Sequence, residues 1–117
     1  MIRVSLRNCY KEAFKLNRKF FHLPDRVIRF DLVDEIDEWG NFCEGEESCA
    51  PKAWIELTKT YPTYQFFREI LAHEMVHLYQ WFNHDYEGGE DHGPSFFNWK
   101  PALKSVNINL QIEYEEK

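Results

Sequence analysis

A His-Glu-x-x-His pattern inside a helical stretch constrains this chain more than any other feature of its sequence. The motif HEMVH occupies residues 73–77, and apolar side chains recur around it every three or four positions from about residue 64 to about residue 82. This periodicity predicts one long, largely buried helix that begins at the N-cap Thr63. Since residues four apart share a face of a helix, the two motif histidines are expected to point at one place.

The motif has the chemistry of a zinc site that activates water. Neutral imidazole is a good zinc ligand, and His73 and His77 on one helix would supply two ligands as a rigid pair. Glu74, beside the first of them, can take a proton from water and pass it to a leaving amine. Zinc lowers the pKa of bound water to about 7, so that hydroxide is available at neutral pH. The alternative is that the two histidines form ordinary local hydrogen bonds and bind no metal.

A catalytic zinc also needs a third protein ligand and one position left for water. Two histidines follow the motif, His84 and His92. His84 lies so close to the predicted helix end that only a sharp reversal would bring it back to the metal. The polar loop of residues 83–93, which contains Gly88-Gly89, is long enough to return His92, and we therefore favour His92. Zinc also accepts carboxylates, so the acidic loop residues are alternatives: Asp85, Glu87, Glu90 and Asp91.

The remaining hydrophobic pattern predicts a single α+β domain over residues 1–117. Spacings of three or four predict an N-terminal helix over residues 3–20, and a short C-terminal helix is expected over residues 94–103. Segments rich in apolar and β-branched residues predict strands at residues 27–33, 39–43, 53–58 and 106–114. The acidic residues 44–48 are predicted to form a loop. The resulting order is zincin-like: helix, small sheet, long motif helix, short helix and terminal strand.

Charge is distributed unevenly along the chain, whose net charge is -6. Residues 1–29 hold eight of the fourteen Lys and Arg and carry +6, so residues 30–117 carry -12. Basic residues in the predicted N-terminal helix recur at intervals of four, at Arg3, Arg7, Lys11, Lys15 and Lys19. Such a stripe is typical of a solvated helix face, and it also suits contact with a phosphate backbone or an acidic protein. The acidic remainder of the chain would repel nucleic acid.

The sequence has no apolar run near the roughly 20 residues that cross a bilayer, and its N-terminus lacks the apolar core of a secretory signal. We therefore expect no membrane partner and a cytoplasmic location, which is the host cytoplasm if a phage encodes the chain. Three cysteines agree with a reducing compartment, because an odd number cannot all pair. Cys43 and Cys49 could share a bridge or a metal, although two ordinary thiols beside a turn are the simpler interpretation.

The run HEMVHLYQWFNHDYEGGEDHGPSFF, residues 73–97, resembles the SprT-like (Spartan-type) zinc metallopeptidases. Their pattern is HExxH, a loop of variable length, and His-Gly-x-x-Phe, which residues 92–96 match. The preceding order of helix, small sheet and motif helix is also similar, so the likeness extends over most of the chain. It implies zinc as the cofactor, with His73, His77 and His92 as ligands and Glu74 as catalytic base and acid.

The resemblance further implies an endopeptidase in which the strand at residues 53–58 lies beside the cleft and pairs with an extended protein or peptide substrate. Better-known relatives act on proteins that are crosslinked to or bound on DNA. This chain has no cysteine after Cys49, so it looks like a minimal form without the C-terminal zinc ribbon that several relatives carry. Tyr86 is a candidate hydrogen-bond donor to a developing oxyanion, or an aromatic that packs the loop.

Two other functions stay open on the sequence alone. A zinc-containing binding module with little or no turnover would use the basic N-terminal helix to contact a partner. Such a structural site would close its fourth position with a ligand such as His84 and would have no need of Glu74. A hydrolase that cleaves another amide would use the same residues, because the site defines how water is activated and not which acyl group is attacked.

Overall fold

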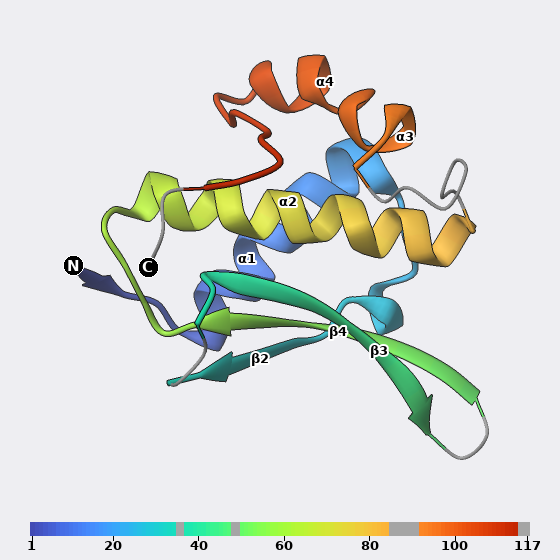
Figure 1. The fold of residues 1–117 in the computed structure, drawn as a ribbon, viewed down its shortest axis with the longest axis horizontal. Helices are drawn as coiled ribbons and strands as arrows, with labels where there is room; N and C mark the ends of the chain where they lie inside the picture. Colours follow the sequence, from blue (N-terminus) through green and yellow to red (C-terminus); the bar gives the residue numbers. More distant parts are fainter. Residues whose placement is uncertain (35–36, 48–49, 85–91, 115–117) are drawn as a thin grey trace.

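The computed structural model describes residues 1–34, 37–47, 50–84 and 92–114. A long helix, α2, runs through the middle of the molecule, with a small sheet on one side and two short helices on the other (Figure 1). The helices are α1 (Leu6–Leu16), α2 (Tyr64–Asn83), α3 (Pro94–Phe97) and α4 (Lys100–Lys104). The strands are β1 (Ile2–Arg3), β2 (Phe30–Val33), β3 (Gly40–Glu47), β4 (Ala50–Thr58) and β5 (Thr60–Tyr61). The predicted α+β class and element order are confirmed, except that the helix expected over residues 94–103 is divided into α3 and α4 and that the terminal strand is missing among the described residues.

Helix α2 forms where the hydrophobic periodicity predicts it, and it is capped at both ends. The Thr63 hydroxyl accepts a hydrogen bond from the backbone N–H of Phe66 at 3.0 Å, which satisfies one of the first-turn N–H groups that have no partner within the helix. At the other end His84 adopts a left-handed conformation with φ 52°, and its N–H bonds to carbonyls of the preceding turn. None of the described helices, α2 included, is long and apolar enough to cross a membrane.

The three-stranded sheet has the order β2-β4-β3, with β2 parallel and β3 antiparallel to the central strand β4. Ile55 of β4 pairs with Phe30 on one side and with Phe42 on the other. Ile55 and Leu57 are fully buried, so one face of β4 contributes to the core against which α2 packs. The prediction of an acidic loop at residues 44–48 is wrong for residues 44–47, which belong to β3; Ser48 lies outside the described residues. An exposed strand tolerates charged side chains, so hydrophobic pattern does not reveal it.

Helix α1 is shorter than the predicted helix over residues 3–20. The chain begins in β1, which pairs antiparallel with β5, and α1 starts after Ser5, whose side chain forms a reciprocal capping box with Asn8. Beyond α1 the chain continues as a π-helical turn over Asn17–Phe21. The buried Asn17 amide exchanges two hydrogen bonds with the backbone of Leu23, at 2.9 and 2.7 Å. These bonds close the helix end and hold the chain as it turns towards the sheet.

Residues 106–114 do not form the predicted terminal strand. After α4 the chain turns at Asn107, which has a φ of 64°, and the segment then runs back over α2 (Figure 1). Ile108 and Leu110 are buried between exposed neighbours, and the Gln65 amide of α2 donates to the carbonyl of Asn107 at 2.5 Å. The alternation of apolar residues therefore corresponds to burial at Ile108 and Leu110, while Ile112 is 46% exposed. The buried residues belong to an extended segment that lies on a helix and not to a strand in a sheet.

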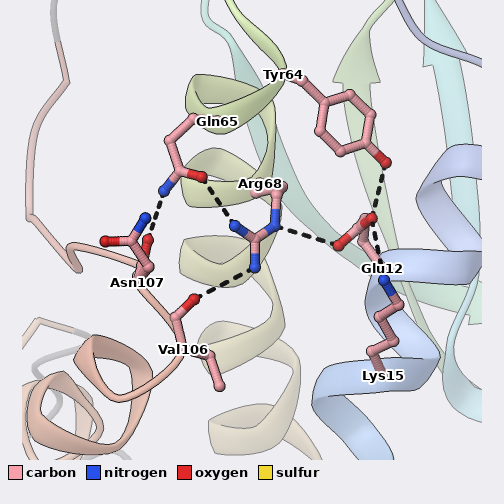
Figure 2. A network of polar contacts seen from close by, with 7 residues as sticks. All are labelled: Glu12, Lys15, Tyr64, Gln65, Arg68, Val106 and Asn107. Atoms are coloured by element: carbon pink, nitrogen blue, oxygen red, sulfur yellow. Dashed lines mark hydrogen bonds and ion pairs between the residues drawn. The ribbon is translucent and has the colours of Figure 1, made fainter.

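A polar network holds the C-terminal segment and α1 to α2 (Figure 2). Arg68 of α2 donates from Nε to the Glu12 carboxylate at 3.3 Å and from Nη2 to the carbonyl of Val106 at 3.4 Å. Glu12 is only 6% exposed and also accepts from the Tyr64 hydroxyl at 2.8 Å. Its buried charge is thus compensated by a cation and a hydrogen-bond donor, without which burial of a carboxylate would be costly.

Candidate metal centre

Three histidines from two separate parts of the chain converge at one point. His73 and His77 lie one turn apart on α2 and are both buried. His92 immediately precedes Gly93, the N-cap of α3, and approaches from outside the helix. The Nε2 atom of His77 lies 3.2 Å from Nε2 of His73 and 3.1 Å from Nε2 of His92. One ligand atom from each of the three lies within 4.8 Å of the other two.

The outer ring nitrogens of the two α2 histidines are engaged by acceptors. Nδ1 of His73 contacts the backbone carbonyl of Gln111 at 2.7 Å, and Nδ1 of His77 contacts the Gln80 side-chain carbonyl Oε1 at 2.8 Å. Both oxygens can only accept, so each Nδ1 carries the proton and donates it. A neutral imidazole protonated at Nδ1 has its lone pair on Nε2, the atom that faces the common point. Metal-binding histidines usually donate their second N–H in this way.

The donor set fits a zinc ion. Zinc binds imidazole nitrogen at about 2.0–2.1 Å with tetrahedral geometry, which places two ligand nitrogens roughly 3.3 Å apart. The Nε2 atom of His77 lies 3.2 Å from Nε2 of His73 and 3.1 Å from Nε2 of His92, which is close to that separation. Two imidazole lone pairs that face each other at such distances repel unless a cation lies between them. The histidine cluster (His73, His77 and His92) is therefore suited to hold a metal ion with three nitrogens.

Phe96 forms the apolar support of the histidine cluster. It lies in the first turn of α3, which Gly93 and Pro94 begin, and its side chain is fully buried. The centroid of its ring lies 4.9 Å from that of His73, 5.1 Å from that of His77 and 4.9 Å from that of His92. One aromatic ring thus packs against all three imidazoles and limits their freedom to rotate.

Glu74 is buried next to the first histidine, with 5% of its surface exposed. Its charge also acts on groups from other parts of the chain. Burial raises the pKa of the Tyr114 phenol above its usual range, and the nearby carboxylates of Glu69 and Glu74 raise it further. Burial likewise raises the pKa of the Cys43 thiol of β3 to about 11, helped by the charges of Glu56 and Glu74. The charge of Glu74, on the motif helix, thus acts both on β3 and on the C-terminal segment.

The profile of the SprT-like family matches residues 11–116 of this chain. The chain belongs to the SprT-like family. The resemblance seen in the histidine motifs is thereby confirmed, and the match extends over α1, the sheet, α2 and the C-terminal segment. No curated protein matches the sequence.

In this SprT-like chain the predicted ligand His92 lies with His73 and His77, whereas His84 does not. His84 is exposed at the C-cap of α2 and lines a separate surface groove of about 380 Å³ beside Arg26 and Trp81. Among the residues that the structure describes, the histidine cluster is the one group of ligand-type side chains close enough to share a metal. The acidic residues named as alternative ligands lie outside the described residues: Asp85, Glu87, Glu90 and Asp91. Tyr86 and Cys49 also lie outside them.

The strand beside the metal centre differs from the expectation. Residues 53–58 belong to β4, the central strand, and its residues 55–57 pair with β2 on one edge and with β3 on the other, so a further strand cannot pair along them. Within the described part of the chain β2 and β3 each pair only with β4, so the outer edges of both strands are open. Phe42 of β3 has its ring centroid 6.4 Å from that of His77, which places β3 next to the cluster. The family resemblance alone did not reveal that β3 flanks β4 on this side.

Sequence reasoning also missed the residues that surround the ligands. Gln80 and the backbone of Gln111 contact the two α2 histidines, and Tyr114 has its ring centroid 5.5 Å from that of His73. The helical spacing of Gln80, three residues after His77, could have identified it as a neighbour on the same face. No pattern in the sequence places the C-terminal residues at the cluster, because their contacts depend on how the segment lies on α2.

Proposed function

We propose that this SprT-like chain is a zinc-dependent metallopeptidase that hydrolyses peptide bonds in proteins or peptides. The observation that carries the proposal is the convergence of three imidazole Nε2 atoms, at 3.2 and 3.1 Å along the cluster, beside the buried carboxylate of Glu74. Membership of the SprT-like family supports the same reaction class. The cofactor would be Zn²⁺, because three neutral nitrogens with tetrahedral spacing are a common catalytic zinc ligand set.

In this mechanism His73, His77 and His92 would hold the metal, and Glu74 would move the proton. When bound, zinc would lower the pKa of a coordinated water to about 7 and would polarise the carbonyl of the substrate. Glu74 accepts a proton from the attacking water and then delivers it to the nitrogen of the leaving amine, so that the carboxylate is regenerated. The Nδ1–H donations from His73 and His77 to oxygen acceptors keep both rings in the tautomer that binds metal.

The substrate would bind as an extended chain along the open edge of β3. Backbone hydrogen bonds to an edge strand recognise a peptide irrespective of its side chains, and Phe42 places this edge beside His77. Because backbone pairing requires an extended conformation, unfolded or loop segments are the expected substrates. This partner class suits a peptidase better than a hydrolase of small amides, which would have no use for a strand edge.

The rival function, a zinc-containing binding module without turnover, is less well supported by the geometry. A structural zinc site normally has four protein ligands. His84, the fourth ligand expected for such a site, belongs to the groove beside Arg26, and no other described ligand-type side chain joins the cluster. The buried Glu74 also has a role in hydrolysis that a closed structural site would not require.

Cleavage of an unfolded protein tests the proposal. Zinc-loaded wild type is expected to cleave casein, and Glu74→Gln is expected to be slower by roughly 10²–10⁴-fold, because a glutamine cannot accept the proton. Chelation should abolish cleavage and added zinc should restore it. A parallel reaction with single-stranded DNA tests nucleic acid as a partner, for which the exposed basic residues Arg7, Lys11 and Lys15 of α1 are the candidate contacts. Equal rates for wild type and Glu74→Gln would refute the proposed mechanism.

A further inference from the structure

The Gln80 side chain is a fully buried amide in a position where the fold alone would accept an apolar residue. It is 0% exposed and lies on the last turns of α2. Burial of an amide is unfavourable unless its hydrogen bonds are satisfied. Both ends of this amide are used: Oε1 accepts from Nδ1 of His77 at 2.8 Å, and Nε2 donates to the Ser95 hydroxyl at 3.0 Å.

The first of these bonds acts on the central member of the histidine cluster. The Nε2 atom of His77 is the one that contacts both of the others, at 3.2 Å to His73 and 3.1 Å to His92. By accepting from Nδ1–H, Gln80 sets the tautomer and the ring orientation of His77. A change in the direction of this ring would alter both of the shortest nitrogen–nitrogen distances in the cluster.

The second bond ties α3 to α2 beside the third histidine. Ser95 is 5% exposed, belongs to the first turn of α3 and lies three residues after His92. Its neighbour Phe96 packs its ring against all three imidazoles. The Gln80–Ser95 bond therefore fixes the helix that carries Phe96 and whose N-cap directly follows His92.

We propose that Gln80 and Ser95 form a positioning relay for the metal centre, in which Gln80 orients His77 directly and Ser95 holds the start of α3 so that His92 stays in register. The inference rests on the proposed zinc site and adds to it two residues that do not touch the metal. Residues of this kind contribute to metal affinity, because mutation of a residue that hydrogen-bonds to a metal ligand typically lowers the affinity by ~10–100-fold. A purely structural pair would instead affect the stability of the metal-free protein and leave the affinity unchanged.

Zinc affinity of the full chain, measured by competition with a chromophoric chelator, separates these roles. Gln80→Leu is expected to weaken zinc binding by ~10–100-fold. Gln80→Glu should bind zinc about as tightly as wild type, since a carboxylate also accepts from Nδ1–H and the Ser95 hydroxyl can donate to it. Gln65→Leu is the matched control, because Gln65 lies on the same helix and its amide contacts Asn107 and Arg68, not the histidines. Urea unfolding of each metal-free variant measures the structural contribution separately.

The Co²⁺ derivative gives an independent measure, because its visible absorption reports ligand geometry around the ion. The spectrum of Gln80→Leu is expected to differ from that of wild type, and the spectra of Gln80→Glu and Gln65→Leu are expected to match it. Equal zinc affinity for Gln80→Leu and Gln65→Leu would overturn the relay. If Gln80→Leu does not fold, Ser95→Ala decides, since unchanged zinc affinity in that variant also overturns the relay. Failure of wild type to bind zinc would instead refute the proposed metal site.

Discussion

Phe96 offers the strongest test of how packing holds the candidate metal centre, and the informative change is Phe96→Ala. The side chain is fully buried, and its ring lies 4.9–5.1 Å from all three imidazoles, measured between ring centroids. Truncation of a buried phenylalanine costs about 3–5 kcal/mol, because the transfer free energy of the ring is lost and a cavity is left. For a chain of this size that corresponds to a fall in Tm of roughly 10–25 °C.

The same change should weaken metal binding, because the cavity lies against the ligands themselves. With the ring absent, the three imidazoles regain rotational freedom that must be lost again when an ion binds. A loss of about 1.4 kcal/mol, equivalent to tenfold in zinc affinity, is the smallest effect we expect. The neighbouring Phe97→Ala is the matched control, because Phe97 is half-buried and its ring contacts Phe96, at 5.3 Å between centroids.

Two measurements on each variant separate stability from binding. Urea unfolding of the metal-free protein gives the free energy of unfolding, and a chelator competition gives the zinc affinity. Phe96→Ala should lower both the free energy of unfolding and the zinc affinity more than Phe97→Ala does. If Phe96→Ala does not fold, Phe96→Leu keeps more of the packing and should show the same order with smaller losses. Loss of stability with unchanged zinc affinity would refute the claim that this ring holds the ligands.

Three further predictions concern the surroundings of the site. Leu110→Ala should lower the free energy of unfolding, measured with urea, by about 2–5 kcal/mol, because Leu110 is fully buried. Zinc affinity should fall as well, since the carbonyl of the next residue bonds to His73. A fall in unfolding free energy below about 1 kcal/mol would contradict the packing of this segment on α2. Arg68→Met should destabilise the fold by up to about 3 kcal/mol, because the buried Glu12 keeps only the more distant cation of Lys15, at 3.9 Å. Glu12→Gln should recover part of that loss in the double variant, and an additive double variant would contradict the pairing. With a pKa raised to about 11, the Cys43 thiol stays protonated at pH 8.5. Iodoacetamide should therefore label it roughly 100-fold more slowly than an ordinary thiol, as measured by peptide mapping. Equal labelling rates would contradict the raised pKa.

The central helix and the paired histidines on it could be predicted from sequence because their signals are local. Hydrophobic spacing over α2 and the cap at Thr63 depend only on neighbours within a turn or two, and both correspond to the observed helix. The spacing of His73 and His77 needs nothing beyond helix geometry. The return of His92 depends on a long loop, and there the loop length and the His-Gly-x-x-Phe resemblance indicated the residue that the structure places at the cluster.

The features that sequence could not predict depend on contacts between distant segments. An alternating pattern over residues 106–114 predicts burial of alternate side chains, which the structure shows for Ile108 and Leu110, and it cannot tell whether a sheet or a helix provides the covering surface. Glu44 and Glu46 follow no hydrophobic pattern because they are exposed on β3. Sheet order likewise decides that β4 is central and that β3 is an edge strand, and no local pattern encodes that order.

The metal content of the purified protein tests the account most directly. Wild type, Glu74→Gln and His92→Ala are equilibrated at the same buffered free zinc concentration, and bound zinc is measured by atomic emission. The account predicts about one zinc per chain for wild type and for Glu74→Gln, and much less for His92→Ala, because one of three ligands is then missing. An absence of zinc from wild type, or full occupancy in His92→Ala, would contradict the three-histidine site.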